Sequence, residues 1–220
     1  MVLKRNVLVV FSGGQDSTTC LAWAMKKFQE VRAVTFDYGQ RHDCEIESAK
    51  KIAKVLKVPL KVIKLPIFKD LTDNALLNKK LPIGAKGKGG LPTTFVDGRN
   101  HIFLSVAAIY AKQQGIFDLI TGVCETDYSG YPDCRDKFIR SLEKTLSLAM
   151  DYRFKIHTPL MFLTKAETVK LIADLGKLDL LRYTHTCYRG EKPACGVCPA
   201  CKLRLKGFRE AKVKDPLFYV

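Results

Sequence analysis

The sequence lacks any long apolar run. None of its 220 residues lies in a stretch that approaches the roughly 18 apolar residues of a membrane-spanning helix. Only two charged residues precede the first short apolar run, and apolar residues make up 47% of the chain, which is enough to bury a sizeable core. We therefore expect a soluble, cytoplasmic protein with no membrane partner.

Acidic residues are scarce relative to basic ones. The chain has 22 Asp and Glu against 37 Lys and Arg, which gives a net charge of +15 and favours an anionic ligand or partner. The lysines at positions 50, 51, 54 and 57 have the spacing of an exposed helix face, and they do not form an Arg-rich block with interleaved aromatic residues. The charge thus indicates an anion without requiring a nucleic acid.

Apolar periodicity predicts strands that alternate with helices. The predicted strands are 5–11, 31–38, 59–65 and 117–123, and the predicted helices are 16–28, 44–56, 100–115, 135–150 and 164–176. This alternation is typical of an α/β fold with a parallel sheet. Thr164 and Glu167 form a capping-box pattern, and Gly176 fits the end of the same helix. The Gly- and Pro-rich segment 66–98 is expected to be a long loop.

The link between the first strand and the first helix reads FSGGQDSTTC. It lacks the lysine of a Walker A loop, and it does not match the Gly-x-Gly-x-x-Gly dinucleotide pattern. Gly13 and Gly14 nevertheless permit close approach of a phosphate, and Ser12, Ser17 and Thr18 add hydroxyl groups at the positive end of a helix. The pattern Ser-Gly-Gly-x-Asp-Ser resembles the pyrophosphate loop (PP-loop) of the N-type ATP pyrophosphatases, which cleave ATP between the α and β phosphates.

Four of the eight cysteines lie close together near the C-terminus, at positions 187, 195, 198 and 201. Four thiolates complete the tetrahedral coordination of zinc, so the spacing predicts a structural zinc site in a small lobe, residues 184–220, that packs with residues 1–183 as one compact unit. A catalytic zinc or an iron–sulfur cluster would use the same residues. His185 could replace a thiolate, although a supporting role beside the ligands or a surface position is favoured.

Polar clusters also follow the predicted strands. They are FDYGQRH at 36–42, TTFVDGRN at 93–100 and TGVCETDYSGYPDCR at 121–135. Because the carboxyl ends of parallel strands share one edge of the sheet, such side chains can surround a planar heterocyclic acid. None of the four histidines can be assigned as a general base from the sequence.

These motifs, together with TPLM, KAET, GKLDL and TCY, resemble the 7-cyano-7-deazaguanine synthases of queuosine biosynthesis over nearly the whole chain, except for residues 66–92. The resemblance implies an adenine nucleotide alpha-hydrolase-like (PP-loop) fold. It implies a ligase that joins 7-carboxy-7-deazaguanine and ammonia at the cost of ATP, through an adenylated acid and an adenylated amide. AMP and pyrophosphate are the expected products, although the family's net reaction is also written with ADP and phosphate. Asp97 departs from the family, which usually has proline before GRN.

The resemblance also implies roles for particular residues. Asp16 would hold magnesium or orient the loop, and Lys165 would contact the ATP phosphates, so Ser12, Asp16, Ser17 and Lys165 are the predicted catalytic residues. One of the two arginines of the predicted substrate site, Arg99 or Arg135, would face the substrate carboxylate. The predicted ATP-binding residues are Phe11, Ser12, Gly13, Gly14, Gln15, Asp16, Ser17, Thr18, Thr19, Cys20 and Leu21; the substrate-binding residues are Arg99, Asn100, Glu125, Asp127, Tyr131, Asp133 and Arg135; and the zinc ligands are Cys187, Cys195, Cys198 and Cys201. A homodimer is expected.

Two other functions fit parts of the sequence. A tRNA-modifying PP-loop enzyme that thiolates or aminates a base would suit the positive charge and could use Cys124 as its reactive thiol, but the chain has no extra RNA-binding domain. A zinc-ribbon protein that binds nucleic acid would not need the intact Ser-Gly-Gly-x-Asp-Ser motif. Binding of tRNA that weakens steeply with salt would distinguish both from the ligase.

Overall fold

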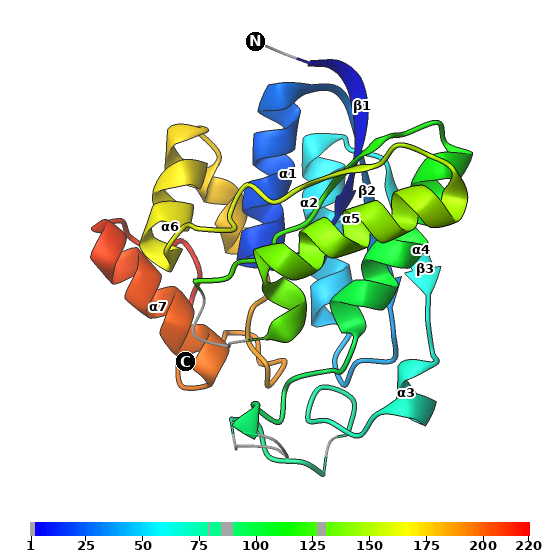
Figure 1. Cartoon of the computed structure of the whole chain (residues 1–220). Coiled ribbons are helices and arrows are strands. Elements are labelled where there is room, and N and C mark those ends of the chain that lie inside the picture. Colours follow the sequence, from blue (N-terminus) through cyan, green and yellow to red (C-terminus); the bar gives the residue numbers. More distant parts are fainter. Residues whose placement is uncertain (1–2, 79, 85–89, 127–130) are drawn as a thin grey trace.

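A computed structural model describes residues 3–78, 80–84, 90–126 and 131–220. Its centre is a five-stranded sheet in which every pair of neighbouring strands is parallel, in the order β3-β2-β1-β4-β5 (Figure 1). The predicted α/β fold with a parallel sheet is thus confirmed. The strands are β1 (Leu3–Val10), β2 (Phe28–Asp37), β3 (Leu60–Lys64), β4 (Asp118–Ile120) and β5 (Lys155–His157).

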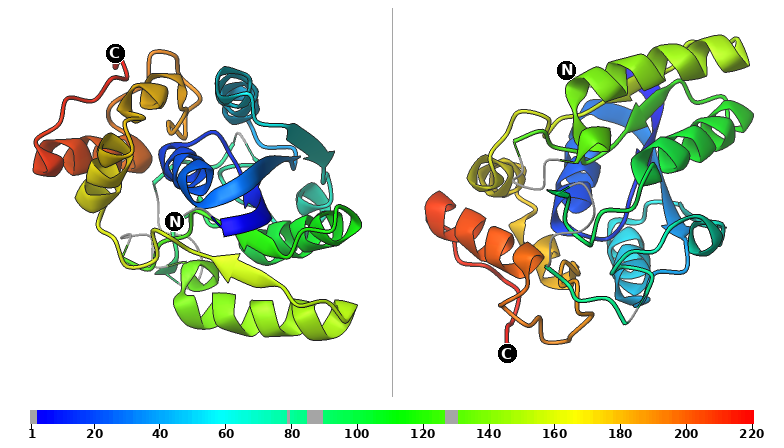
Figure 2. Two further views of the ribbon diagram at one scale, coloured as in Figure 1. Left: turned by 90° about the horizontal axis from the view of Figure 1, so that it is seen from above. Right: turned by 60° about the horizontal axis from the view of Figure 1, so that its bottom comes forward.

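Helices cover both faces of this sheet, as the left view of Figure 2 shows. Because side chains alternate along a strand, β1 contributes Val7 and Val9 to one face and Leu8 to the other. Val7 and Val9 pack with α1 (Gln15–Lys27) and α2 (Cys44–Leu56), whereas Leu8 packs with α4 (Arg99–Gln113) and α5 (Asp136–Met150). The central strand is therefore buried on both sides, which explains its continuous apolar run.

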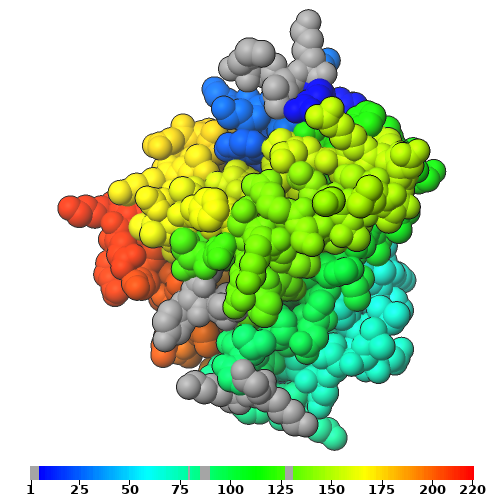
Figure 3. Space-filling model, viewed as in Figure 1, coloured from blue at the N-terminus to red at the C-terminus, as the bar shows by residue number. Residues whose placement is uncertain are grey.

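The C-terminal part extends this core beyond α1. Helix α6 (Lys165–Asp174), the 3-10 helix η3 (Leu178–Tyr183) and helix α7 (Pro199–Ala211) share a buried apolar cluster with Ala22 of α1. Val169 and Ile172 of α6 meet Phe208 and Ala211 of α7 in that cluster. The space-filling view shows the C-terminal residues directly against α6 (Figure 3). Two short helices, α3 (Phe68–Leu71) and η2 (Pro132–Cys134), complete the described elements.

The predicted strands and helices are confirmed, with shifted ends. Helix α6 has both hydrogen bonds of the predicted capping box, and Gly176 follows it with φ of +66°. Five elements were not predicted. Three are the short helices α3, which lies in the predicted long loop 66–98, η2 and η3. The other two are β5, which has only three residues, and α7, which lies in a segment whose only predicted feature is the cysteine cluster. Such a short strand carries little periodicity of its own, so only its pairing with β4 defines it. No helix in the described part of the chain is long and apolar enough to cross a membrane.

Candidate active site and metal centre

A cavity of about 300 Å³ opens at the carboxyl ends of the central strands. Its walls come from residues that follow β1, β2 and β4, and from α4, α6 and the C-terminal segment. From β1 the chain adds β2 and β3 on one side of the sheet and then β4 and β5 on the other side. Open parallel sheets bind their ligands at such a reversal, which here lies between β1 and β4. The fold thus places a cavity at the position that the motifs predict.

One end of the cavity is formed by the loop that leads from β1 into α1. Gly13 has φ of +83°, and a Cβ atom on it would lie 2.5 Å from both the backbone nitrogen of Ala49 and the carbonyl oxygen of Glu45. The backbone nitrogen of Gly14 donates to Ser12 Oγ at 3.3 Å, and Ser12 Oγ lies 3.1 Å from Ser17 Oγ. No described side chain caps α1, and the first residues of this helix line the cavity, so its N-terminus is open to an anion there.

Lys165 and Asp16 meet beside this loop although 149 residues separate them. Lys165 Nζ donates to the two carboxylate oxygens of Asp16 at 2.9 and 2.8 Å, and only 9% of the lysine side chain is exposed. Helix α7 can approach this close because residue 207 is glycine: a Cβ there would lie 2.5 Å from Lys165 Cγ. Lys165 is therefore a cavity residue and not a surface lysine.

Another part of the cavity wall contains an arginine, an acid and tyrosines. Arg99 Nη1 lies 3.4 Å from the hydroxyl of Tyr38, to which it donates, and Glu45 and Tyr188 line the same wall. Burial alone would lower the pKa of Arg99. The negative charges that Tyr38, Glu45 and Tyr188 can carry raise this pKa, so the guanidinium stays charged. Burial raises the pKa of Glu45 and of both tyrosines, and Arg99 opposes each of these shifts.

The predicted substrate residues have different positions relative to the cavity. Arg99, Asn100 and Tyr131 line it. Asp133 does not, but its carboxylate accepts the backbone N–H of Asn100 at 3.0 Å, so it orients a residue that does. Tyr131 is buried, and its hydroxyl oxygen lies 3.0 Å from the hydroxyl oxygen of Thr94.

Two further predicted residues, Glu125 and Arg135, are not among the described residues that line the cavity. Glu125 accepts the backbone N–H of Asp136 at 3.0 Å, at the start of α5. Asp127 is outside the described residues. Asp97, which stands where the family usually has proline, is exposed. Helix α4 still begins after Gly98, and Arg99 is its first residue. Substrate binding by these residues remains a prediction.

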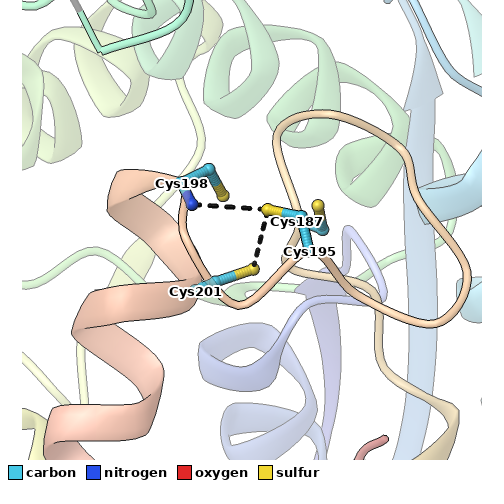
Figure 4. Close-up of side chains that lie close together, drawn as sticks. All are labelled: Cys187, Cys195, Cys198 and Cys201. Carbon is cyan, nitrogen blue, oxygen red and sulfur yellow. Dashed lines mark hydrogen bonds between the residues drawn. The ribbon is translucent and has the colours of Figure 1, made fainter. Parts of the chain in front are cut away.

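The four predicted metal ligands converge, as Figure 4 shows. The sulfur atoms of Cys187, Cys195, Cys198 and Cys201 all lie within 4.8 Å of one another, and all four residues are buried. Cys198 precedes the first residue of α7 and Cys201 lies in its first turn, so the helix presents two of the four sulfurs. Four convergent, buried sulfurs fit a tetrahedral ion such as zinc with no position left open for water.

His185 supports this cluster without joining it. Its Nε2 lies 2.9 Å from the carbonyl oxygen of Cys187, and burial lowers the pKa of the ring, so a neutral imidazole that donates to the carbonyl is favoured. The group of potential ligands among the described residues consists of the four cysteines alone. The sequence-based preference for a supporting role of His185 agrees with this geometry.

Arg204 is a residue that sequence reasoning missed. It is 1% exposed, and its Nε and Nη2 donate to the two carboxylate oxygens of Asp215 at 2.8 Å each. Its Nη1 donates to the hydroxyls of Thr184 at 2.6 Å and Thr186 at 3.2 Å. Arg204 and Thr186 also line the cavity. Nothing in the basic helix KLRLKGFRE distinguishes this arginine from its exposed neighbours, apart from its spacing of four residues from Phe208.

Comparisons with known proteins agree with the geometry. A model of the family "Queuosine biosynthesis protein QueC" matches residues 6–212. Two curated proteins named 7-cyano-7-deazaguanine synthase, from Clostridium botulinum strain 657 (type Ba4) and strain Langeland (type F), are 54% and 53% identical to the chain over 210 residues, which is 94% of this chain and 96% of each relative.

Two solved structures resemble the chain more distantly. A predicted subunit of tRNA methyltransferase from Methanocaldococcus jannaschii is 22% identical with a TM-score of 0.49, over 77% of this chain and 74% of that one. NMN synthetase from Francisella tularensis is 16% identical with a TM-score of 0.45, over 79% and 62%. The family match, by contrast, includes the glycine loop, the cavity wall and all four clustered cysteines.

Proposed function

The chain belongs to the family of the queuosine biosynthesis protein QueC, and we propose that it is a ligase that converts 7-carboxy-7-deazaguanine, ammonia and ATP into 7-cyano-7-deazaguanine. One observation carries this proposal: a single cavity is lined both by the glycine loop that follows β1 and by a charged arginine among tyrosines. Such a cavity can hold ATP and a planar aromatic acid with their reacting groups together.

The loop supplies what adenylation requires. A carboxylate is a poor electrophile, and transfer of AMP to it creates a leaving group while pyrophosphate departs with high negative charge. The N–H groups of the first turn of α1, the hydroxyls of Ser12 and Ser17 and the ammonium of Lys165 would stabilise that charge. Asp16 would hold the magnesium that accompanies ATP, and its pairing with Lys165 keeps both groups beside the loop.

The same site would act twice. Attack of ammonia on the acyl adenylate gives the primary amide and AMP, and adenylation of the amide oxygen then lets the oxygen leave, which gives the nitrile. Both activations occur on the same carbon, so one loop and one cavity suffice. AMP and pyrophosphate are the products that this sequence of steps requires.

Arg99 would bind the substrate carboxylate. Its guanidinium stays charged at the cavity wall and presents paired N–H donors that match a carboxylate. Tyr38, Tyr131 and Tyr188 line the same region, where their rings can contact a planar heterocycle. Arg99→Lys keeps the charge but loses the paired donors, and we expect it to raise KM for the acid more than KM for ATP.

We propose that the four cysteines bind zinc. A closed site of four thiolates leaves no position for water, so the ion would stabilise the C-terminal segment and take no part in the reaction. Metal analysis of the purified protein tests this: zinc at one ion per chain supports the proposal, whereas iron with acid-labile sulfide would replace it with an iron–sulfur cluster.

The activity is tested by incubating the purified protein with 7-carboxy-7-deazaguanine, ammonium and Mg-ATP, followed by mass spectrometry of the nitrile, AMP, ADP and pyrophosphate. Nitrile that accumulates with AMP and pyrophosphate supports the ligase and double adenylation. Absence of nitrile and of acid-dependent ATP turnover in zinc-loaded protein contradicts the ligase, and salt-sensitive tRNA binding would then favour a tRNA substrate.

The remaining expectations concern assembly and location. We propose a homodimer in the cytoplasm that acts on small molecules and does not bind nucleic acid for its function. Sedimentation equilibrium over a range of concentrations tests the dimer, and a mass equal to one 24.7 kDa chain throughout that range contradicts it.

A further inference from the structure

The cavity contains one acid that no described residue neutralises at short range. Two acidic side chains line it, Asp16 and Glu45. Asp16 accepts two hydrogen bonds from Lys165. The carboxylate of Glu45, in contrast, forms no hydrogen bond or ion pair with any residue that the structure describes. Glu45 is therefore available to a ligand in a way that Asp16 is not.

The position of Glu45 relates it to both ends of the cavity. It is the second residue of α2, and its carbonyl oxygen lies so close to Gly13 that a Cβ on this glycine would be 2.5 Å away. Its carboxyl group is close enough to Arg99 for each to change the pKa of the other. Glu45 thus has its backbone against the phosphate loop and its carboxyl group within electrostatic range of the arginine. With ATP at the loop and the substrate acid on Arg99, the reacting carbon must lie in the same region.

We infer that Glu45 is the general base that removes a proton from ammonium for attack on the adenylated substrate. This role rests on the proposed function. Ammonium has no lone pair, so it must lose a proton before its nitrogen can form a bond to carbon. Each amide formed then releases two protons. Glu45 accepts the first from ammonium before attack and passes it to solvent through the cavity mouth. The second leaves the nitrogen for solvent as the C–N bond forms and the C–O bond to AMP breaks.

The surroundings of Glu45 suit this role. Burial raises the pKa of its carboxyl, which makes it a stronger base toward ammonium than an exposed glutamate, while Arg99 limits the rise. The other titratable groups of this wall are Tyr38 and Tyr188, whose pKa values burial raises, and His185, whose pKa burial lowers. The tyrosines therefore stay neutral, so Glu45 is the carboxyl group that can accept a proton in this part of the described wall. When it is ionised, its carboxylate among tyrosines also attracts ammonium itself.

The test separates adenylation from ammonia transfer. Glu45→Gln keeps the shape and polarity of the side chain but cannot accept a proton. Glu47→Gln is the matched control, because Glu47 lies two residues away on the same helix, is exposed and pairs only with Lys50 among the described residues. Three rates are measured for each protein: the exchange of pyrophosphate into ATP that depends on the substrate acid (acid-dependent exchange), product formation with ammonium, and product formation with hydroxylamine. Hydroxylamine is mostly unprotonated at neutral pH and needs no base to attack.

We expect Glu45→Gln to retain pyrophosphate exchange within about twofold, which also shows that it is folded. Its ammonium-dependent rate should fall by about 100-fold, the lower range for loss of a general base, while its hydroxylamine rate stays near that of the unaltered protein. Glu45→Asp, which keeps a carboxylate, should recover part of the ammonium rate. Glu47→Gln should match the unaltered protein in all three rates.

Other outcomes would overturn the inference. If Glu45→Gln loses exchange, or loses the hydroxylamine and ammonium rates equally, Glu45 recognises the substrate acid and is not the base. An unchanged ammonium rate removes any catalytic role. If the unaltered protein itself shows no acid-dependent exchange, the proposed function fails, and the role of Glu45 fails with it. That result is distinct because it does not depend on the variant.

Discussion

The buried pair of Arg204 and Asp215 should contribute more to stability than any other ion pair in the described chain. Their side chains are 1% and 7% exposed, and two hydrogen bonds of 2.8 Å join them. The guanidinium also donates to Thr184 and to the carbonyl oxygen of Leu181. This one side chain therefore connects α7, η3 and the C-terminal tail. We predict that Arg204→Met destabilises the protein strongly.

The magnitude follows from the partners that remain. Removing one partner of a buried ion pair typically costs about 3–5 kcal/mol, because the other charge is left buried without compensation. Asp215 would still accept the hydroxyl of Tyr219 at 2.6 Å and the backbone N–H of Leu217 at 3.0 Å. We therefore expect the lower end, about 3 kcal/mol, which for a chain of this size lowers Tm by roughly 6–12 °C.

The assay is thermal and urea unfolding of metal-loaded protein at constant metal concentration. Arg209→Met is the matched control: it removes an exposed arginine from the same helix, and its effect should stay within about 0.5 kcal/mol. A double variant, Arg204→Met with Asp215→Leu, should lose less than Arg204→Met alone, since it leaves no unpaired charge. Destabilisation by Arg204→Met no larger than that of the control would refute the reasoning.

Four further predictions concern the loop, the metal site, the lysine and the capping box. Gly13→Ala should abolish ATP binding measured by calorimetry, because a positive φ and contact with the α2 backbone both oppose a side chain; unchanged ATP affinity would show that the loop can shift. Cys198→Ser should lose the bound metal on dialysis and unfold the C-terminal segment first, and full metal retention by mass spectrometry would argue against four-sulfur coordination. Lys165→Met should lower kcat for acid-dependent pyrophosphate release by at least about tenfold with little change in KM for the acid, whereas the reverse pattern would place Lys165 at the acid. Glu167 has a lowered pKa because the backbone N–H and the side-chain hydroxyl of Thr164 donate to its carboxylate. Its contribution to stability is therefore complete above the ordinary carboxyl range and is lost as the pH falls through the lowered pKa. In Thr164→Ala, NMR titration should show the pKa of Glu167 return toward its usual value.

Much of the site could be predicted because its signals are local in the chain. The glycine loop, the capping box and the cysteine spacing each depend on residues within a few turns of one another, and the structure places all three as their patterns indicate. The substrate residues were less predictable. Arg99 and Tyr131 line the cavity, but Glu125 points to the start of α5, because an acid near a helix N-terminus serves a cap as readily as a ligand.

The residues that were missed share one property: their role depends on burial and on distant neighbours. Arg204 lies in a run of basic residues and becomes a central contact only because α7 packs with that face inward. Glu45 lies in the first turn of an ordinary amphipathic helix, and it becomes a cavity acid without a hydrogen bond to any described residue only where α2 meets the glycine loop. Apart from the spacing of Arg204 from Phe208, neither feature leaves a periodic or spacing signal in the sequence.

The amino-acid sequence by itself determined the parallel α/β architecture, the glycine loop after the first strand and the cluster of four cysteines, because strand and helix periods, turn-forming glycines and cysteine spacing act over short stretches of chain. Only the tertiary structure decided which charges face one another. It joined Lys165 to Asp16 across 149 residues and Arg204 to Asp215, and it left Glu45 beside Arg99 in the cavity. These pairings depend on how helices pack against the sheet, and that packing follows from burial of the whole core.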